Sequence, residues 1–245
     1  MGIGSVPRHT GVVNSADPIL DPPFLDPAAR DRVVVSGPDA LTYLQSQIAQ
    51  DIRGLPVGAA AWTLVLEPNG KVDSLARVTR RGDEVFEFDI ESGFGESLAT
   101  RLRRFKIRVA AEIEVVPAGD GAAVSAADED ARIAAGWPMM GAEILPGETI
   151  PAVTGVTGVA VNFTKGCYPG QELVERMDSR GAAAPSALRV LTLGHDVPLA
   201  AQPGDPVLDD AGTTIGTVTS VGSNHALATI KRGHTIGTAP AHVDA

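Results

Sequence analysis

The chain of 245 residues is poor in cysteine, in aromatic side chains and in long apolar runs. Its single cysteine, Cys167, excludes an internal disulfide, a CxxC redox pair and a four-cysteine metal cage built by this chain alone, and it suits a reducing compartment. No apolar run reaches the length of about 18 residues that a membrane-spanning helix needs. The first residues lack the apolar core of a signal peptide, so we expect a cytoplasmic protein without membrane partners.

Positive charge is also scarce, since the formal net charge is -10 and the isoelectric point about 4.9. This balance argues against direct nucleic-acid binding by the surface as a whole. Five of the 20 lysines and arginines nevertheless fall within one short segment, at Arg101, Arg103, Arg104, Lys106 and Arg108. Such a cluster either binds carboxylates or phosphates or forms a solvated helix face beside acidic neighbours.

Hydrophobic residues make up 44% of the chain, and 27 glycines and 18 prolines predict a globular, turn-rich fold. Residues 1–30, rich in proline and aspartate, are predicted to be an extended lead-in. Asn69-Gly70 between two apolar runs predicts a β-hairpin. The other predicted elements are strands at 32–36, 84–90 and 107–116, a helix from Asp39 through Ile52, and a helix at 97–105 with its arginines away from the apolar stripe of Leu98, Leu102 and Phe105. The acidic stretch 117–131 indicates a loop or a shortened element.

The pattern changes near residue 186 to closely spaced short strands. We expect residues 186–245 to form a small antiparallel β-barrel. Residues 31–185 are then expected to form an α+β body.

Residues 162–181 hold the strongest chemical signal, because Cys167 lies there among glycines and beside Lys165. A neighbouring lysine lowers the pKa of a thiol, so Cys167 is a candidate nucleophile, metal ligand or redox-sensitive site; the alternative is a buried structural thiol. The five histidines lie far away in the sequence, so no Cys–His pair is predicted. Asp73 follows the hairpin turn in an apolar strand, where its carboxylate points either into a ligand cavity or to solvent.

The segment KGCYPGQE at 165–172, continued as LVERMDSRG, resembles the YgfZ family, folate-binding relatives of the glycine-cleavage T-protein. The resemblance extends upstream through LEPNGKVDSLARV and LRRFKIRV, and it spans most of residues 33–235. It implies a two-lobed, T-protein-like α+β body around a central folate cavity, followed by a small β-barrel. It also implies a role in the synthesis or repair of iron–sulfur enzymes, including those that thiolate tRNA.

The same resemblance implies the site residues. Cys167 would be the functional thiol and a transient contact for an iron–sulfur cluster. Lys165 and Asp73 would be the other two catalytic residues. The implied cofactor is tetrahydrofolate or a derivative, with binding residues at Asp73, Arg104, Tyr168, Gly170, Gln171 and Glu172.

Two positions depart from the relatives. Ser74 stands where the T-protein carries the second of two aspartates, and Val153 stands where many YgfZ proteins carry a glutamate. The first departure weighs against aminomethyl transfer, because a hydroxyl does not carry the negative charge of a carboxylate. Our leading hypothesis is therefore an accessory factor for iron–sulfur client enzymes. The alternatives are a tetrahydrofolate-dependent aminomethyltransferase or other one-carbon transferase, and a binding module that uses the cations at 101–108.

Overall fold

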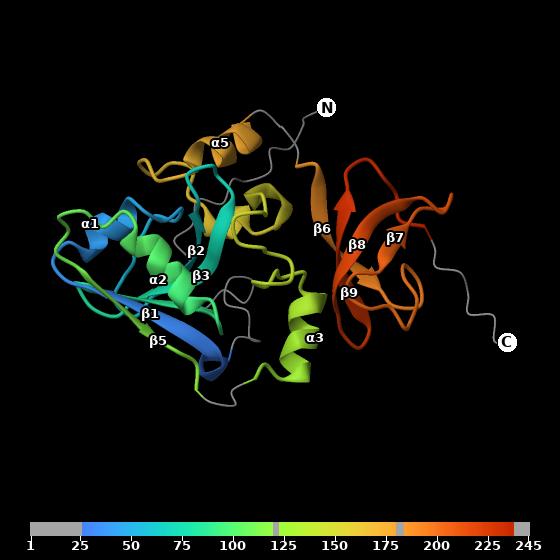
Figure 1. The fold of residues 1–245 in the computed structure, drawn as a ribbon, viewed down its shortest axis with the longest axis horizontal. Helices are drawn as coiled ribbons and strands as arrows, with labels where there is room; N and C mark the ends of the chain where they lie inside the picture. Colours follow the sequence, from blue (N-terminus) through green and yellow to red (C-terminus); the bar gives the residue numbers. More distant parts are fainter. Residues whose placement is uncertain (1–25, 120–122, 180–183, 238–245) are drawn as a thin grey trace, which may run out of the picture.

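The computed structural model describes residues 26–119, 123–179 and 184–237, which form two antiparallel sheets with helices around and between them (Figure 1). Most of the predicted lead-in and the last eight residues, 238–245, lie outside the described residues. The α+β class and the antiparallel sheets are as predicted. No described helix is long and apolar enough to cross a membrane.

The first sheet has five strands in the order β2-β3-β4-β1-β5. Its strands are β1 (Arg30–Ser36), β2 (Ala60–Leu66), β3 (Val72–Arg80), β4 (Val85–Glu91) and β5 (Glu112–Val116). The hairpin predicted at Asn69-Gly70 joins β2 and β3, and the predicted strands at 32–36 and 84–90 are β1 and β4. β5 is shorter than predicted because residues 107–111 run outside the sheet, where Arg108 has a positive φ of 55°.

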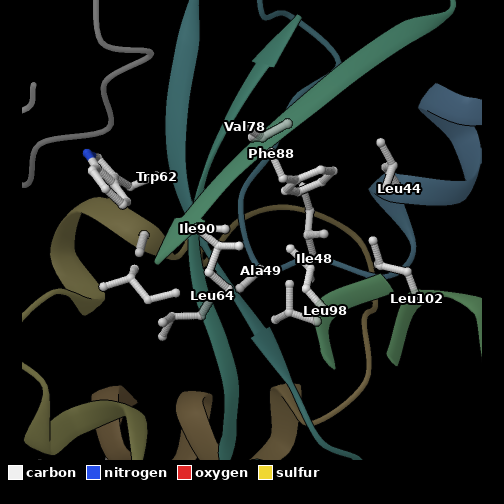
Figure 2. Close-up of a cluster of buried hydrophobic side chains, with 14 of the residues drawn as sticks. Leu44, Ile48, Ala49, Trp62, Leu64, Val78, Phe88, Ile90, Leu98 and Leu102 are labelled. Carbon is white, nitrogen blue, oxygen red and sulfur yellow. The ribbon is translucent and has the colours of Figure 1, made fainter. Parts of the chain in front are cut away.

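Two helices, α1 (Ala40–Gln45) and α2 (Gly95–Arg103), cover one face of this sheet. Leu44, Leu98 and Leu102 pack toward Phe88 in a fully buried core (Figure 2). The helix predicted from Asp39 to Ile52 ends early, because Ile48 leaves the helix to pair with β2 at Val65. Ile48 and Ile52 are nevertheless buried. Their spacing therefore indicated which residues are buried, and not how long the helix is.

The face of β4 that lies opposite Phe86 and Phe88 is buried at its centre as well, although the alternation in β4 predicted a half-buried strand. Glu87 and Asp89 lie there and are met by arginines: Arg81 binds Glu87 at 2.6 Å, and Arg77 is the register partner of Asp89. Burial raises the pKa of Asp89, and Arg30 is the strongest influence in the opposite direction. Arginines that are themselves half exposed thus compensate the charge of the buried Glu87.

The middle of the chain is helical in its described parts, with no strand between residues 123 and 179. It contains α3 (Ala126–Ala134), η2 (Pro151–Val153), α4 (Thr157–Ala160) and α5 (Gln171–Ser179). The stretch 117–131, for which the sequence favoured neither a loop nor an element, therefore contributes the start of a helix. Ser125 caps this helix by accepting a hydrogen bond from the Asp128 amide at 3.1 Å.

The second sheet has the order β6-β9-β8-β7, formed by β6 (Ser186–Thr192), β7 (Pro206–Leu208), β8 (Thr214–Val221) and β9 (His225–Lys231). The prediction of a closed barrel is wrong. Within the described residues β6 and β7 are the two edge strands of an open sheet and do not pair with each other. β7 has only three residues and begins with a proline that lacks an amide donor, which gives it little capacity to close the sheet.

A buried group of charges joins the second sheet to the rest of the chain through α3, which lies between the two sheets in Figure 1. Arg132 of α3 binds Glu143 at 3.0 Å and donates to the Ser220 hydroxyl on β8 at 2.8 Å. Ser220 in turn donates to Glu143 at 2.6 Å, and Arg132 also pairs with Glu129. We call Arg132, Glu143 and Ser220 the joint.

Candidate functional site

The candidate site is built around the turn of the β2–β3 hairpin, residues 67–71. The Gly70 amide donates to the Glu67 carbonyl, and the Lys71 amide donates to the Asn69 side chain. Gly70 has a φ of +85°, a conformation that favours glycine at this point of the turn.

The loop that carries Cys167 packs directly on this turn. A Cβ added to Gly170 would lie 2.5 Å from the Glu67 carbonyl oxygen and 2.9 Å from the Gly70 Cα, and the φ of Gly170 is +80°. Only glycine fits such a close approach of two backbones. Two segments about 100 residues apart in the sequence, which the family resemblance singled out separately, therefore form one structural unit.

Asp73 lies at a β-bulge just beyond the turn. Val65 pairs with Ser74 and Leu66 with Val72, so Asp73 is the extra residue of the bulge. Bulges re-aim side chains, and they recur beside functional sites. The Asp73 side chain is not solvent-exposed, since the residue is only 6% accessible, and Ser74 donates its hydroxyl hydrogen to Oδ1 of Asp73 at 2.7 Å. Burial raises the pKa of Asp73, and the carboxylate of Glu67 raises it further.

Arg101 of α2 reaches the end of β2 from the other side. The residue is 3% accessible, and its Nε and Nη2 donate to the Leu66 carbonyl at 3.0 and 2.5 Å. Its Nη1 is buried without a hydrogen-bond partner. Asp73 is close enough to act electrostatically on Arg101, yet no ion pair joins the two in the described part of the chain. Burial lowers the pKa of Arg101.

Arg101 does not lie on an exposed arginine face, contrary to the helix prediction. It follows Leu98 by three residues and precedes Phe105 by four, so its spacing places it beside the apolar stripe. That spacing was the signal that could have identified it as buried. The other residue that sequence reasoning missed is Glu67, because no sequence motif singles it out. It lies in the hairpin turn, where its carboxylate pairs with Arg104 and raises the pKa of Asp73.

Lys165 anchors the cysteine loop to the segment after α1. Its Nζ donates to the carbonyls of Ile48 and Gln50 at 2.5 and 2.9 Å and lies 5.3 Å from the centre of the Tyr168 ring. Burial lowers the pKa of Lys165 to about 8. The ammonium group is thus engaged with backbone oxygens, which fixes where the loop begins.

Cys167 itself is exposed, together with Gly166. The buried structural thiol considered above is therefore excluded as a description of this residue. The neighbouring Tyr168 is buried, its hydroxyl has no hydrogen-bond partner, and burial raises its pKa to about 12. An exposed thiol on a loop held at both ends is accessible to a second molecule without movement of the fold.

Three more predicted site residues lie at the edges of this arrangement. Gln171 accepts a hydrogen bond from the Tyr168 amide and donates to Glu175, while Glu172 pairs with Arg176 along α5. Arg104 pairs with Glu67 at 3.3 Å. The structure thus brings Asp73, Gly170 and Arg104 to the hairpin turn, and it places Gln171 and Glu172 on the helix that follows the cysteine loop.

The remaining cations of the cluster differ in their surroundings. Arg103 donates to the Ile113 carbonyl at 2.9 Å and pairs with Glu96. Arg104 and Arg108 are exposed, and Lys106 is half-buried.

Within the described residues no group of three or more His, Cys, Asp or Glu side chains could hold a metal ion. A pocket of about 260 Å³ lies away from the hairpin turn, between α3 and the β8–β9 connection, and it is lined by residues that include Asp130, Ile133, Asn224 and His225. None of the predicted site residues lines that pocket. The central folate cavity therefore stays a prediction.

No family model matches the chain. The chain is 26% identical to the tRNA-modifying protein YgfZ of Serratia proteamaculans over 77% of its length and 76% of that protein. The resemblance to the YgfZ family is confirmed. An uncharacterized protein of Haemophilus influenzae is 27% identical over 61% of the chain, and the match spans 66% of that relative, just under two thirds.

The fold is similar to that of the glycine cleavage system aminomethyltransferase T from Bartonella henselae. The TM-score is 0.70 over 84% of this chain and 77% of that structure, with 15% sequence identity. This likeness shows that the chain has a T-protein-like fold, and its two sheets are antiparallel.

Proposed function

We propose that the chain is a folate-binding accessory protein that supports the synthesis or repair of iron–sulfur enzymes, including those that thiolate tRNA, in the cytoplasm. The observation that carries this proposal is the packing of Gly170 on the hairpin turn, so close that an added Cβ would lie 2.5 Å from the Glu67 carbonyl oxygen. This packing joins the loop of the exposed Cys167 to the strand of the buried Asp73.

Asp73 supplies the chemistry that a folate ring requires. A pterin presents adjacent N–H donors, and an ionised carboxylate accepts two hydrogen bonds side by side. The residues present fit this ligand: Ser74 occupies only one oxygen of Asp73, and Arg101 Nη1 and the Tyr168 hydroxyl are buried polar atoms without partners. Bound tetrahydrofolate would supply one-carbon chemistry, and Asp73 would orient its ring in the central cavity that we propose.

Ser74 favours a binding role over aminomethyl transfer. Its hydroxyl hydrogen is donated to Asp73, so the pair carries at most one negative charge where two aspartates would carry up to two. A one-carbon transferase is therefore the weaker alternative for this chain.

In this proposal the exposed thiol of Cys167 contacts a client enzyme. One thiolate does not hold a cluster alone, so an iron–sulfur group treated as cargo needs its other ligands from a client enzyme or a small thiol. In this proposal Lys165 is a positioning residue, since its ammonium group holds the loop through the carbonyls of Ile48 and Gln50.

The direct test is calorimetric titration with 5-formyltetrahydrofolate. The wild type should bind, and Asp73→Asn should bind at least about tenfold more weakly because a charge-assisted hydrogen bond is lost. Cys167→Ser is the matched control: it should bind folate like the wild type and lose only its support of client enzymes. Absence of binding in the wild type would refute the folate role.

A further inference from the structure

One face of the first sheet has a charged centre that is buried. Glu87 and Asp89 of β4 lie there, and Thr79, the register partner of Glu87 on β3, is only 3% accessible. Of the described helices, α1 and α2 make the main contacts with β4 and β1, and both lie on the opposite face, with Phe88 (Figure 2). The described helices therefore do not account for the burial at the centre of this face.

Three polar atoms on the same face lack hydrogen-bond partners. Arg30 Nε, Thr79 Oγ1 and Glu91 Oε2 are buried and bond to no group in the described part of the chain. The register places them on the face of Glu87, because Thr79 lies opposite Glu87 and Arg30 lies opposite Glu91. Buried polar atoms without partners are unfavourable, so a segment that supplied backbone donors and acceptors would stabilise this face.

Positive charge exceeds negative charge around Glu87. Arg81 binds this carboxylate at 2.6 Å, and Arg32 binds it at 3.7 Å, so one carboxylate meets two guanidinium groups. Both arginine side chains are half exposed and keep donors that point away from Glu87. A further carboxylate would complete the compensation of charge at this place.

The sequence just before β1 has the chemistry that this face lacks. Residues 10–29 contain Asp17, Asp21 and Asp26 and no lysine, arginine or histidine. Apolar side chains stand between these acids, at Ile19, Leu20, Phe24 and Leu25. The prolines at 18, 22 and 23 favour extended backbone and remove amide donors, which suits a segment that crosses a sheet face better than a strand added to an edge.

The segment is also long enough to cross the face. The first described residue, Asp26, precedes the start of β1 at Arg30 by four residues. From Arg30 to Ser36, β1 spans about 20 Å, and Ser36 is the register partner of Val85 at the far end of the face. The chain from Asp26 back to Asp17 spans up to about 30 Å when extended, so its aspartates can reach either end.

We propose that residues 13–25, the strap, bind across the charged face of the first sheet of the same chain, with Asp17 and Asp21 beside Arg32 and Arg81. Backbone groups of the strap then meet the buried polar atoms of Arg30, Thr79 and Glu91. The inference goes beyond the proposed function and does not depend on it, since it uses none of the candidate site residues. It gives the proline-rich lead-in a binding partner and closes this face to other molecules.

The test measures the accessibility of this face in the full-length chain. Thr79→Cys in a Cys167→Ser background provides a single thiol at the covered position, and its rate of reaction with a maleimide reports opening of the strap. This thiol should react slowly in the otherwise intact chain. A glycine–serine linker of equal length in place of residues 13–25 should raise the rate at least about tenfold, which corresponds to a strap held by about 1.4 kcal/mol.

Charge variants test the ion pairs of the strap. Asp17→Lys/Asp21→Lys should also raise the rate. The control, Glu148→Lys/Asp210→Lys, makes the same change in net charge at two exposed acids and should leave the rate low. A synthetic peptide of residues 13–25 should slow the reaction of the linker variant again, and the effect should saturate with peptide concentration.

Circular dichroism establishes that each variant is folded, and Val34→Cys, opposite Glu87 on β1, replaces Thr79→Cys if the latter is not. A fast reaction in the intact chain would overturn the inference, because the face would then be open. An equally slow reaction in the folded linker variant would overturn it too, because a different part of the chain would then cover the face. A rate raised by the control as much as by the strap aspartates would refute the ion pairs.

Discussion

Buried arginines at two places in the molecule have opposite surroundings. At the joint, Arg132 is satisfied by Glu143, Glu129 and Ser220. At the hairpin turn, Arg101 is buried beside the carboxylate of Asp73 without an ion pair, and one of its donors is unused. Desolvation opposes both charges. The fully paired Arg132 holds elements together, whereas Arg101 keeps a donor from which a ligand oxygen could accept a hydrogen bond, as our proposal requires.

The strongest way to break this comparison is to remove one charge from the joint. Glu143→Ala should lower the free energy of unfolding by about 3–5 kcal/mol, because Arg132 then loses its buried carboxylate partner and Ser220 loses its acceptor. Urea unfolding followed by fluorescence and circular dichroism measures the loss. The double variant Arg132→Met/Glu143→Leu should recover most of the stability, and an equally unstable double variant would contradict the explanation.

A second prediction concerns the contact between the cysteine loop and the hairpin. Gly170→Ala should cost about 2–4 kcal/mol, because the new methyl group meets the Glu67 carbonyl and the residue is held at positive φ. Folate binding should be lost with it. Gly166→Ala, in the same loop but facing open space, is the control and should change neither quantity. Similar thermal midpoints for the two variants would show that the close contact is unimportant.

The third prediction uses the pH dependence of Asp73. Burial raises its pKa in the folded state, so its contribution to stability is present below the unfolded pKa of about 3.9 and is lost as the pH rises through the folded value. Asp73→Asn should therefore be more stable than the wild type at neutral pH, and the difference should vanish in acid. Melting temperatures between about pH 4 and 8 test this. A variant less stable than the wild type at neutral pH would mean that Asp73 is paired in the folded state.

The smallest expected effect concerns the backbone strain at the exposed Arg108, in contrast to the buried Arg101 and Arg132. Arg108→Gly should raise the free energy of unfolding by about 0.5–1 kcal/mol, because glycine relieves the left-handed strain but adds entropy to the unfolded chain. Chemical denaturation of this variant beside Arg108→Ala measures the gain, since alanine keeps the strain. Equal stabilities would mean that the backbone there is relaxed.

Local patterns predicted the strands and the hairpin well, because Asn69-Gly70 and the alternation of Phe86 and Phe88 depend on near neighbours. The same patterns failed where distant segments compete. Ile48 pairs with β2 instead of extending α1, and the buried Glu87 is paired with Arg32 of β1 and Arg81 of the β3–β4 turn. The barrel failed because closure depends on the length of one short strand, β7.

For the site, the sequence proposed candidate residues but did not predict which groups they contact. Asp73 was recognised as a candidate, yet its bulge and its bond from Ser74 depend on the register of β2 against β3. Lys165 was expected beside the thiol, and its contacts with the carbonyls of Ile48 and Gln50 depend on how the chain returns after α1. Their roles, like the division of the chain near residue 186, stay predictions.

The exposure of Cys167 has a practical consequence. It is the one sulfhydryl of the chain, so a maleimide dye would label a single, known position without any substitution. Gly170 and Lys165 fasten that position to the hairpin turn and to the segment after α1. The native protein thus carries a built-in attachment point for a fluorescent reporter of events at its own site.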